Sequence, residues 1–380
     1  MKKVLVFAEQ ILPPGQTFIP IAVNSLTRFE PQYIGLRPVT PSAPLPAPPL
    51  LLTKANTQRS RIRREIYRLT GIAPRFHRLA KDKRAALIHA HFAEGAAAAV
   101  SLSNSLDIPF VMHLRGGAEL YPDSALCAKA FEWSYLMWRR QMWNHCSRFL
   151  CVSRFIHDRA LAAGFPREKL TVHFTGIDFS RFSPFPPGTR RDRTLLLYVG
   201  RLVRYKGADH FIRATDVVRR HCKAAHAVII GDGWFRPEAE RLAAELAIPC
   251  QFLGDQPAHV VREYMGRARV FCVPSRTLED GMSEAFGNVF TEAQAMGLPA
   301  VAYRHGGIVE TMLEGETGLL ADENDIYGLA AHMERFLDDN EFWNLCSHRG
   351  AEWVRKEFDV HSQTAKLEEL YDTVISEGTN

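Results

Sequence analysis

Two glutamates about three quarters of the way along the chain have the type and spacing for chemistry on a sugar. Glu284 and Glu292 have seven residues between them and flank the expected start of a helix. The first turn of a helix leaves backbone N–H groups without partners, and these donors at the positive end of the helix dipole favour a phosphate. Carboxylates beside a bound anion are suited to accept hydrogen bonds from sugar or ribose hydroxyls. The spacing therefore indicates a phosphate site with one carboxylate on each side.

The local pattern predicts where this helix begins and ends. Asn288 is expected to be the N-cap, Gly297 to end the helix, and Pro299 to prevent its continuation. Gly287 lets a ligand approach the backbone closely because it has no side chain. The same pattern also fits an ordinary capped helix with two solvated glutamates.

A pair of cations follows a continuous apolar run. Leu195–Val199 is typical of a parallel strand buried on both faces, and Arg201 and Lys206 flank the turn after it. An arginine with forked hydrogen bonds and a lysine acting as a point charge can together neutralise a diphosphate. Surface salt bridges are the alternative for both side chains.

Short apolar runs predict the elements that position these residues. Ala268–Ser275 and Pro299–Tyr303 read as strands on either side of the glutamate-bearing loop and helix, which is the order of a parallel βαβ unit. In such sheets ligands bind at the carboxyl ends of the strands. Gly231 and Gly233 follow another such strand, Ala227–Ile230, but they do not complete a dinucleotide fingerprint.

From about residue 150 to the C-terminus, the chain resembles glycosyltransferase family 4. The motifs that carry the resemblance are the paired glutamates, Gly-Arg-Leu-Val-x-x-Lys-Gly at 200–207, Gly-Leu-Pro-Ala-Val-Ala at 297–302, Gly306-Gly307-Ile308 with Glu310, and Gly-Glu-Thr-Gly-Leu-Leu at 315–320. The resemblance implies an α/β fold of the GT-B architecture, with two Rossmann-like domains whose parallel sheets face a central cleft. It also implies a retaining, hexosyl-type transferase that uses a nucleoside diphosphate sugar and needs neither a metal nor another cofactor.

The resemblance also assigns roles to residues. Arg201, Lys206 and the helix N–H groups would stabilise the charge on the departing diphosphate. Glu284 would hold hydroxyls of the donor sugar, Glu292 the ribose, and the segment around Leu253 the nucleobase. The expected donor-binding residues are Arg201, Lys206, Gly231, Gly233, Leu253, Glu284, Ala285, Phe286, Gly287, Asn288, Val289 and Glu292, and the expected catalytic residues are His113, Glu284, Arg201 and Lys206.

The N-terminal half carries a candidate for the histidine that lines the family's cleft near the transferred sugar. His113 ends the apolar run 108–113 and is the natural match. However, the usual His-Gly order is replaced by His-Leu-Arg-Gly, and aligning on the glycine puts Arg115 in the histidine's place. Both residues remain candidates, with His113 preferred.

Two further segments of the N-terminal half are expected to face the cleft or an acceptor. His91 shares one face of the predicted strand 87–92 with His89, which suggests a metal pair. No third ligand is evident nearby, so no metal site is predicted. The loop Gly15, Gln16 and Thr17 follows the first strand, and a plain strand–helix turn is its alternative.

The sequence predicts two domains with a boundary near residue 182. Gly176 allows a tight turn, and the Pro- and Gly-rich stretch 183–189 is a credible linker. Residues 1–182 are expected to form an acceptor-binding domain and residues 190–360 a nucleotide-sugar-binding domain. By resemblance, the last helix, about 361–380, packs back on the first domain.

Charge is divided unequally between the halves. Residues 1–180 hold 24 Lys and Arg against 12 Asp and Glu, net +12, whereas residues 181–380 hold 23 against 30, net −7. A basic half, concentrated at 59–84, suggests an anionic surface or ligand, and no nucleic-acid-binding motif accompanies it. The resemblance implies that this half carries the acceptor, so we expect a glycan or lipid-linked acceptor and peripheral contact with an anionic membrane. The aromatic-rich helix 131–143 either lies at that interface or is buried.

The remaining composition predicts a cytoplasmic protein, peripheral at the inner face of the plasma membrane. The first apolar run is too short for a signal peptide, and no run reaches the roughly 20 apolar residues that span a membrane. The seven cysteines are scattered without metal-ligand spacing, as expected of reduced thiols.

Three functions fit these patterns. The first is a glycosyltransferase of surface polysaccharide or glycolipid biosynthesis. The second is a nucleotide-sugar epimerase of the same architecture, and the third is a non-catalytic nucleotide-sugar-binding protein. The donor sugar, its base and the acceptor are not legible in the sequence.

Overall fold

The computed structural model describes residues 1–11, 17–38, 45–121, 133–184, 191–279 and 281–378. The chain divides into two compact units, and each is described by itself. Unit 1 comprises Met1–Gly176 and Val360–Asn380, and unit 2 comprises Ile177–Asp359. Both are α/β structures built on a parallel sheet.

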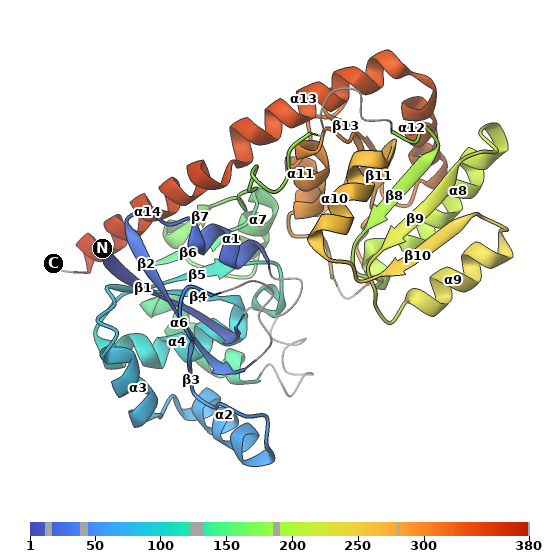
Figure 1. Ribbon diagram of the computed structural model, residues 1–380. Coiled ribbons are helices and arrows are strands. Elements are labelled where there is room, and N and C mark those ends of the chain that lie inside the picture. The colour runs from blue at the N-terminus through green and yellow to red at the C-terminus, as the bar shows by residue number, and fades with distance from the viewer. Residues whose placement is uncertain (12–16, 39–44, 122–132, 185–190, 280, 379–380) are drawn as a thin grey trace. The chain divides into compact units, whose positions relative to one another are not determined.

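Unit 1 is built on a seven-stranded parallel sheet in the order β3-β2-β1-β4-β5-β6-β7 (Figure 1). Its strands are β1 Lys2–Gln10, β2 Phe29–Arg37, β3 Leu50–Leu51, β4 Leu87–His91, β5 Phe110–Leu114, β6 Arg148–Cys151 and β7 Leu170–Val172. Its α-helices are α1 Phe18–Asn24, α2 Gln58–Thr70, α3 Pro74–Lys81, α4 Phe92–Leu106, α6 Trp133–His145, α7 Arg154–Ala162 and α14 Val360–Glu377, and its 3-10 helices are η1 Ala118–Leu120 and η3 Arg167–Lys169.

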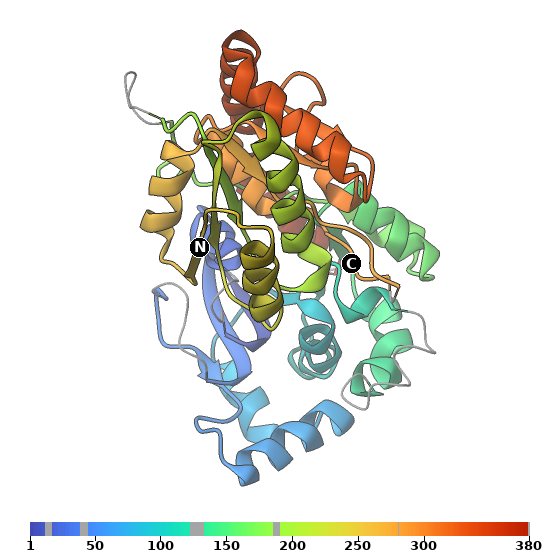
Figure 2. The same cartoon turned by 90° about the vertical axis from the view of Figure 1, so that its right-hand side faces the viewer.

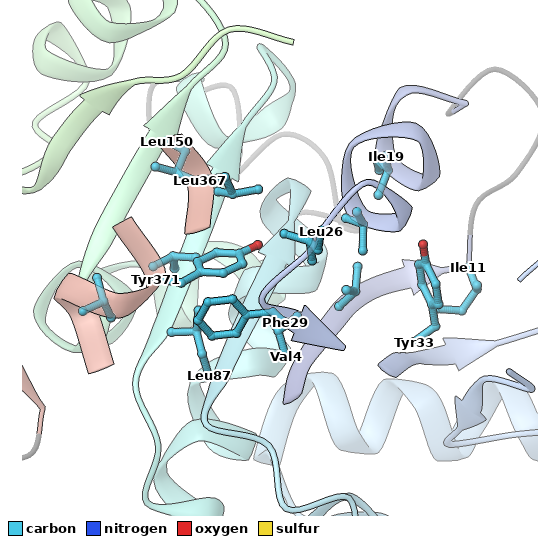
Figure 3. Close-up of a cluster of buried hydrophobic side chains, with 14 residues drawn as sticks. Val4, Ile11, Ile19, Leu26, Phe29, Tyr33, Leu87, Leu150, Leu367 and Tyr371 are labelled. Atoms are coloured by element: carbon cyan, nitrogen blue, oxygen red, sulfur yellow. The ribbon is translucent and has the colours of Figure 1, made fainter. Parts of the chain in front are cut away.

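The C-terminal helix α14 completes the core of unit 1. Its Leu367, Tyr371 and Val374 are spaced for one helical face and pack into a cluster with residues of β1, β2, β4, β5 and β6 (Figure 3). The Tyr371 ring meets the Phe29 ring edge-to-face at 5.2 Å between centroids. Burial of one such large side chain is worth about 1.5–3 kcal/mol. The sheet face under α1 and α14 is therefore closed by a segment far away in sequence.

Unit 2 is a six-stranded parallel sheet in the order β10-β9-β8-β11-β12-β13. Its strands are β8 Leu195–Val199, β9 His226–Ile230, β10 Cys250–Gly254, β11 Val270–Cys272, β12 Ala300–Tyr303 and β13 Gly318–Ala321. Its α-helices are α8 Ala208–His221, α9 Arg236–Glu245, α10 Ala258–Arg267, α11 Asn288–Ala295, α12 Ile326–Asp338 and α13 Asn340–Phe358, and its 3-10 helices are η4 Arg204–Lys206 and η5 Gly306–Glu310.

Local sequence explains why these elements form. In β8 the first four residues of the apolar run Leu195–Val199 are buried, as expected of a strand covered on both faces. In α8 the buried residues Phe211, Ile212, Thr215 and Val218 recur at helical spacing, so one face packs on the sheet.

The division between the units differs slightly from the predicted boundary at residue 182. Unit 1 ends at Gly176, because the backbone N–H of Ile177 already donates to the Phe358 carbonyl of α13 at 2.6 Å. A side chain at 176 would meet the Val360 backbone at 2.7 Å, so glycine is required where the chain leaves unit 1. The second crossing, between Asp359 and Val360, falls at the predicted limit.

Two further observations bear on the sequence predictions. No helix within the described ranges is both long and apolar enough to cross a bilayer. The six described cysteines are free, and four of them are buried.

Candidate functional site

The candidate residues of unit 2 gather at the carboxyl edge of its sheet. The strand order reverses direction between β8 and β11, and this switch point is where open α/β sheets bind ligands. Arg201 and Lys206 follow β8, whereas Glu284 lies in the segment between β11 and α11. Residues 83 positions apart in sequence are thus brought to one edge because β8 and β11 are hydrogen-bonded neighbours.

Lys206 and Glu284 form an ion pair at this edge. The Lys206 Nζ contacts Glu284 Oε2, and the two side chains are only 13% and 12% exposed. Burial by itself lowers the pKa of Lys206, but the Glu284 carboxylate outweighs it and the pKa is raised. The Ser275 hydroxyl lies 3.4 Å from the same carboxylate oxygen. Lys206 is therefore charged, and it keeps donors for a second anion because an ammonium group has three.

Two glycines, Gly306 and Gly307, pack closely against the backbone of the segment that carries Glu284. The backbone N–H of Gly307 donates to the Glu284 carbonyl at 3.0 Å. A Cβ at Gly306 would stand 2.3 Å from that carbonyl oxygen, and a Cβ at Gly307 would stand 2.1 Å from the Ala285 carbonyl oxygen. Gly306 also has a left-handed backbone with φ 52°. Glycines are required here because the two backbones touch.

His305 fixes the backbone of Glu284 and was not among the predicted site residues. It is buried, and its Nε2 accepts the Glu284 backbone N–H at 3.0 Å. Because Nε2 accepts, the ring proton is on Nδ1, which lies 3.1 Å from Glu323 Oε2. The sequence signal was the histidine directly before Gly306-Gly307 at the end of the strand β12.

The start of α11 differs from the prediction. Asn288 was expected to cap the helix, but it is the first helical residue, and Gly287 is the N-cap with φ 91° and no side-chain cap. The left-handed conformation of Gly287 turns the chain into the helix, so no capping side chain covers the first N–H groups. Asn288 and Val289 in this first turn are half-buried.

Glu292 lies one turn inside α11 and is half-buried. Burial raises its pKa to about 7, and the charge of Arg181 opposes this only in part. No hydrogen bond to its carboxyl occurs within the part of the chain that the structure describes. The Glu292 carboxyl therefore titrates near neutrality and is available to hydrogen-bond a ligand.

The other predicted donor-binding residues lie on the neighbouring strands. The Arg201 side chain is exposed and donates from Nη2 to the Tyr205 hydroxyl at 2.9 Å. Gly231 and Gly233 both have positive φ, and a Cβ on either would stand 2.1–2.3 Å from a carbonyl oxygen of the loop 200–202. They hold the loop that carries Arg201. The Leu253 carbonyl accepts the side-chain amide of Gln256 at 2.6 Å.

The candidates of unit 1 also gather at a sheet edge. His91 ends β4, His113 lies in β5, and Arg115 follows directly after β5. All three line one small cavity, and its other walls come from α1, from the segment after β7 and from α14. Thr17 directly precedes α1, whereas Gly15 and Gln16 lie outside the described residues.

The structure brings the two alternatives for the cleft histidine into contact. The Arg115 Nη2 lies 3.4 Å from His113 Nδ1, and its guanidinium stacks on the Phe18 ring at 4.4 Å. Burial lowers the pKa of Arg115 to about 9 and that of His113 well below its ordinary value. Since the guanidinium can only donate, His113 Nδ1 accepts, and the ring of His113 is neutral.

The sequence shows no third ligand near His89 and His91, but the structure places His113 beside them. His113 is the register partner of His91 across β4 and β5, and nitrogens of all three rings lie within 4.8 Å of one another. A separation of 22 residues hid the third histidine from the sequence, because only the strand register reveals it.

Comparison with known proteins decides the family. The family model for Glycosyltransferase Family 4 matches residues 37–181, and the model for glycosyl transferases group 1 matches residues 180–353. The chain belongs to glycosyltransferase family 4. Together the two matches run through both units of this family 4 chain.

Curated relatives of this family 4 chain act in glycolipid or polysaccharide synthesis by name. A GDP-mannose-dependent α-(1-6)-phosphatidylinositol monomannoside mannosyltransferase of Mycolicibacterium smegmatis is 31% identical, over 61% of this chain and 63% of the relative. The colanic acid biosynthesis glycosyltransferase WcaL of Escherichia coli, itself named as putative, is 29% identical, over 61% of this chain and 58% of the relative. The chain thus spans about three fifths of these relatives.

Solved structures identify the fold of this family 4 chain as GT-B. The Anabaena protein HepE, solved with UDP and glucose, superposes with a TM-score of 0.75 over 98% of this chain and 99% of its own, at 17% identity. Sucrose-phosphate synthase from Thermosynechococcus elongatus gives a TM-score of 0.75 over 99% and 100%, at 19% identity. At such low identity these likenesses establish the fold alone.

Proposed function

We propose that this chain is a retaining glycosyltransferase that moves a hexosyl group from a nucleoside diphosphate sugar to an acceptor hydroxyl in polysaccharide or glycolipid biosynthesis. One observation carries the proposal. The charged Lys206 is paired with Glu284, the first glutamate of the family motif, at the switch point of the unit 2 sheet. Glu284 lies three residues before Gly287, the N-cap of α11, where no side chain caps the helix.

The chemistry follows from these groups. When the bond to the sugar breaks, negative charge grows on the diphosphate. Lys206, Arg201 and the N–H groups at the start of α11 would stabilise that charge, and they do so best when they are already in place. Because the cationic set supplies this stabilisation, we propose that donor binding needs no metal.

The two glutamates would hold the hydroxyl-bearing parts of the donor. Glu284 is fixed by Lys206 and by His305 on its backbone, so its carboxylate would accept hydrogen bonds from the transferred sugar. Glu292 would bind the ribose when ionised. In unit 1, His113 and Arg115 are proposed for the reacting sugar and the acceptor. No enzymic nucleophile is proposed, and attack on the same face as the departing phosphate would give retention.

The acceptor side is proposed to lie at the inner face of an anionic membrane, which makes the protein cytoplasmic. Helix α2 supports this, because Ile62, Ile66 and Leu69 form one stripe along it and are 54%, 51% and 47% exposed. Exposed arginines flank the stripe at 59, 61 and 63. An apolar stripe between basic side chains is the pattern of a helix that lies in a lipid interface. Figure 2 shows the backbone of this helix in light blue. The named substrate of the mycolicibacterial relative is likewise a phosphatidylinositol lipid.

Part of the basic run serves a structural role instead. Arg64 and Arg68 are buried, with Arg64 donating to Thr53 and Arg68 paired with Glu9 and Glu65. Helix α6 supports burial of the described part of the aromatic-rich segment. Its Tyr135 and Met142 are fully buried, although Trp133 and Met137 remain exposed.

The test is donor binding followed by turnover. Nucleoside diphosphates and their sugars are screened by thermal shift with EDTA present, and each stabilising sugar is then assayed for hydrolysis or transfer. We expect one base to raise the melting temperature, and Glu284→Gln to lower turnover by about 100-fold or more while the nucleoside diphosphate still binds. Turnover to an isomeric nucleotide sugar without acceptor would instead identify an epimerase, and unchanged turnover in the variant would refute the role of Glu284.

A further inference from the structure

Three buried histidines occupy one corner of unit 1. His89 and His91 alternate with Ala90 on β4 and so share a face, and His113 pairs with His91 across to β5. The side chains are 1%, 1% and 3% exposed. Each ring offers a nitrogen within 4.8 Å of the other two.

The hydrogen-bonding capacity of this cluster is not used. Both ring nitrogens of His91 and the Nε2 of His113 are buried without a partner among the described residues. Buried polar atoms are nearly always paired, and each unpaired one costs about 1–3 kcal/mol. The orphaned nitrogens therefore call for a ligand that the protein itself does not provide.

The spacing between two of the ring nitrogens is compatible with metal coordination. His89 Nε2 and His113 Nδ1 are 3.3 Å apart. Two nitrogens bound to one tetrahedral Zn²⁺ at about 2.0–2.1 Å lie about 3.3 Å from each other.

We propose that His89, His91 and His113 form a binding site for one divalent cation of the Zn²⁺ type. Imidazole nitrogens suit Zn²⁺, Co²⁺, Ni²⁺ and Cu²⁺, and three of them leave a fourth position open for water or another ligand. The three histidines line one small cavity together with Phe18 and His173.

Tyr371 of α14 orients the first ligand. Its hydroxyl lies 2.6 Å from His89 Nδ1, so a proton on Nδ1 leaves the lone pair of Nε2 for the metal.

Arg115 opposes the cation and sets its affinity. Its Nη2 lies 3.4 Å from His113 Nδ1. The Glu119 carboxylate accepts the Arg115 backbone N–H at 2.8 Å, and its charge opposes, only in part, the lowering of the Arg115 pKa by burial. A fixed positive charge this close weakens cation binding, and the guanidinium competes for the His113 nitrogen. Removing the charge must therefore tighten the site, which no purely structural role of Arg115 predicts.

The site is tested on the whole chain, stripped with a chelator and titrated with Co²⁺. We expect one equivalent to bind with the visible absorption of a four-coordinate centre, and Zn²⁺ to abolish that absorption by displacement. His91→Ala should weaken binding at least 100-fold, whereas Arg115→Gln should tighten it at least fivefold. His173→Ala is the matched control, since it removes an imidazole from the same cavity but leaves the three ligands, and it should change affinity less than threefold.

The stripped protein showing no saturable Co²⁺ absorption would overturn the proposal. So would His91→Ala binding as tightly as the parent, or His173→Ala losing as much affinity as His91→Ala. If His91→Ala does not fold, the proposal is still tested, because Arg115→Gln must bind Co²⁺ more tightly than the parent protein. The titration uses no nucleotide or sugar, so its outcome is independent of the proposed transferase activity and of metal-free donor binding in unit 2.

Discussion

The two units place different chemistry at the same position of the same kind of sheet. In unit 2, Lys206 and Glu284 meet as a charged pair at the switch point. In unit 1, the corresponding edge collects neutral imidazoles and one cation, Arg115, whose backbone N–H donates to the Glu119 carboxylate at 2.8 Å. The fold fixes where a site forms, and the residue types at the strand ends decide what it binds.

This difference teaches how each edge can respond to a ligand. An ion pair keeps both groups charged, and a lysine with spare donors can add a phosphate without a change of protonation. Neutral rings instead offer lone pairs, which suit coordination or hydrogen bonds.

Removing the charge from the edge of unit 2 is expected to have the largest effect. Lys206→Met should lower kcat by about 100- to 1,000-fold, because a preorganised donor to the leaving charge is lost. Initial rates with saturating donor measure the change. The matched control is Arg204→Met, which removes a charge from the same turn but from an exposed side chain paired with Glu238 at 3.7 Å. Equal losses in both variants would mean that net charge, and not the Lys206 contact, is responsible.

The exposed apolar stripe on α2 offers the second test of the difference between the two units. Ile62→Glu with Ile66→Glu should reduce binding to phosphatidylglycerol vesicles at least tenfold, because two apolar contacts become like charges to the lipid. Sedimentation at low and high salt measures this, since the basic flanks predict salt sensitivity. The control variant is Leu345→Glu on α13 of unit 2. It also replaces an exposed apolar residue by glutamate, but in the acidic half of the chain, and it should leave vesicle binding unchanged. If the variant with both substitutions in unit 1 still sediments completely with the vesicles, the stripe does not contact lipid.

The smallest expected effect concerns Glu292. Its pKa of about 7 means that the carboxyl gains charge as pH rises through neutrality. Nucleotide affinity should therefore increase severalfold from pH 6 to pH 8, and Glu292→Gln should flatten this dependence. Because the folded pKa lies above the ordinary 4.5, the folded state holds the extra proton between these values. The free energy of unfolding should accordingly fall as pH rises from about 4.5 to about 7.

The sequence predicted well wherever a short segment determines its own structure. The apolar run of β8 and the cations after it lie where the pattern placed them, because a strand buried on both faces leaves a plain signature. The cap of α11 was missed for the opposite reason. Asn288 has the better capping propensity, but close contacts of the neighbouring backbone with Gly306 and Gly307 favour a left-handed Gly287.

Features that depend on strand register were beyond the sequence. Neither His305 under Glu284 nor His113 beside His91 is near its partner in the chain, and each contact exists because parallel strands bring their ends together. The basic run shows a similar limit. Its arginines look alike in sequence, yet Arg64 and Arg68 are buried while their neighbours meet solvent, since only a helical register separates them.

The placement of α14 has a consequence for the order in which the protein matures on the ribosome. Unit 2 is one continuous stretch and can collapse as soon as it emerges, whereas unit 1 lacks Leu367 and Tyr371 until residues beyond unit 2 have been synthesised. Domains usually mature from the N-terminus onward during synthesis. Here the sheet of unit 1 is synthesised first, but one of its faces stays uncovered until α14 has been made. Newly made chains therefore expose a binding surface for chaperones for a longer time.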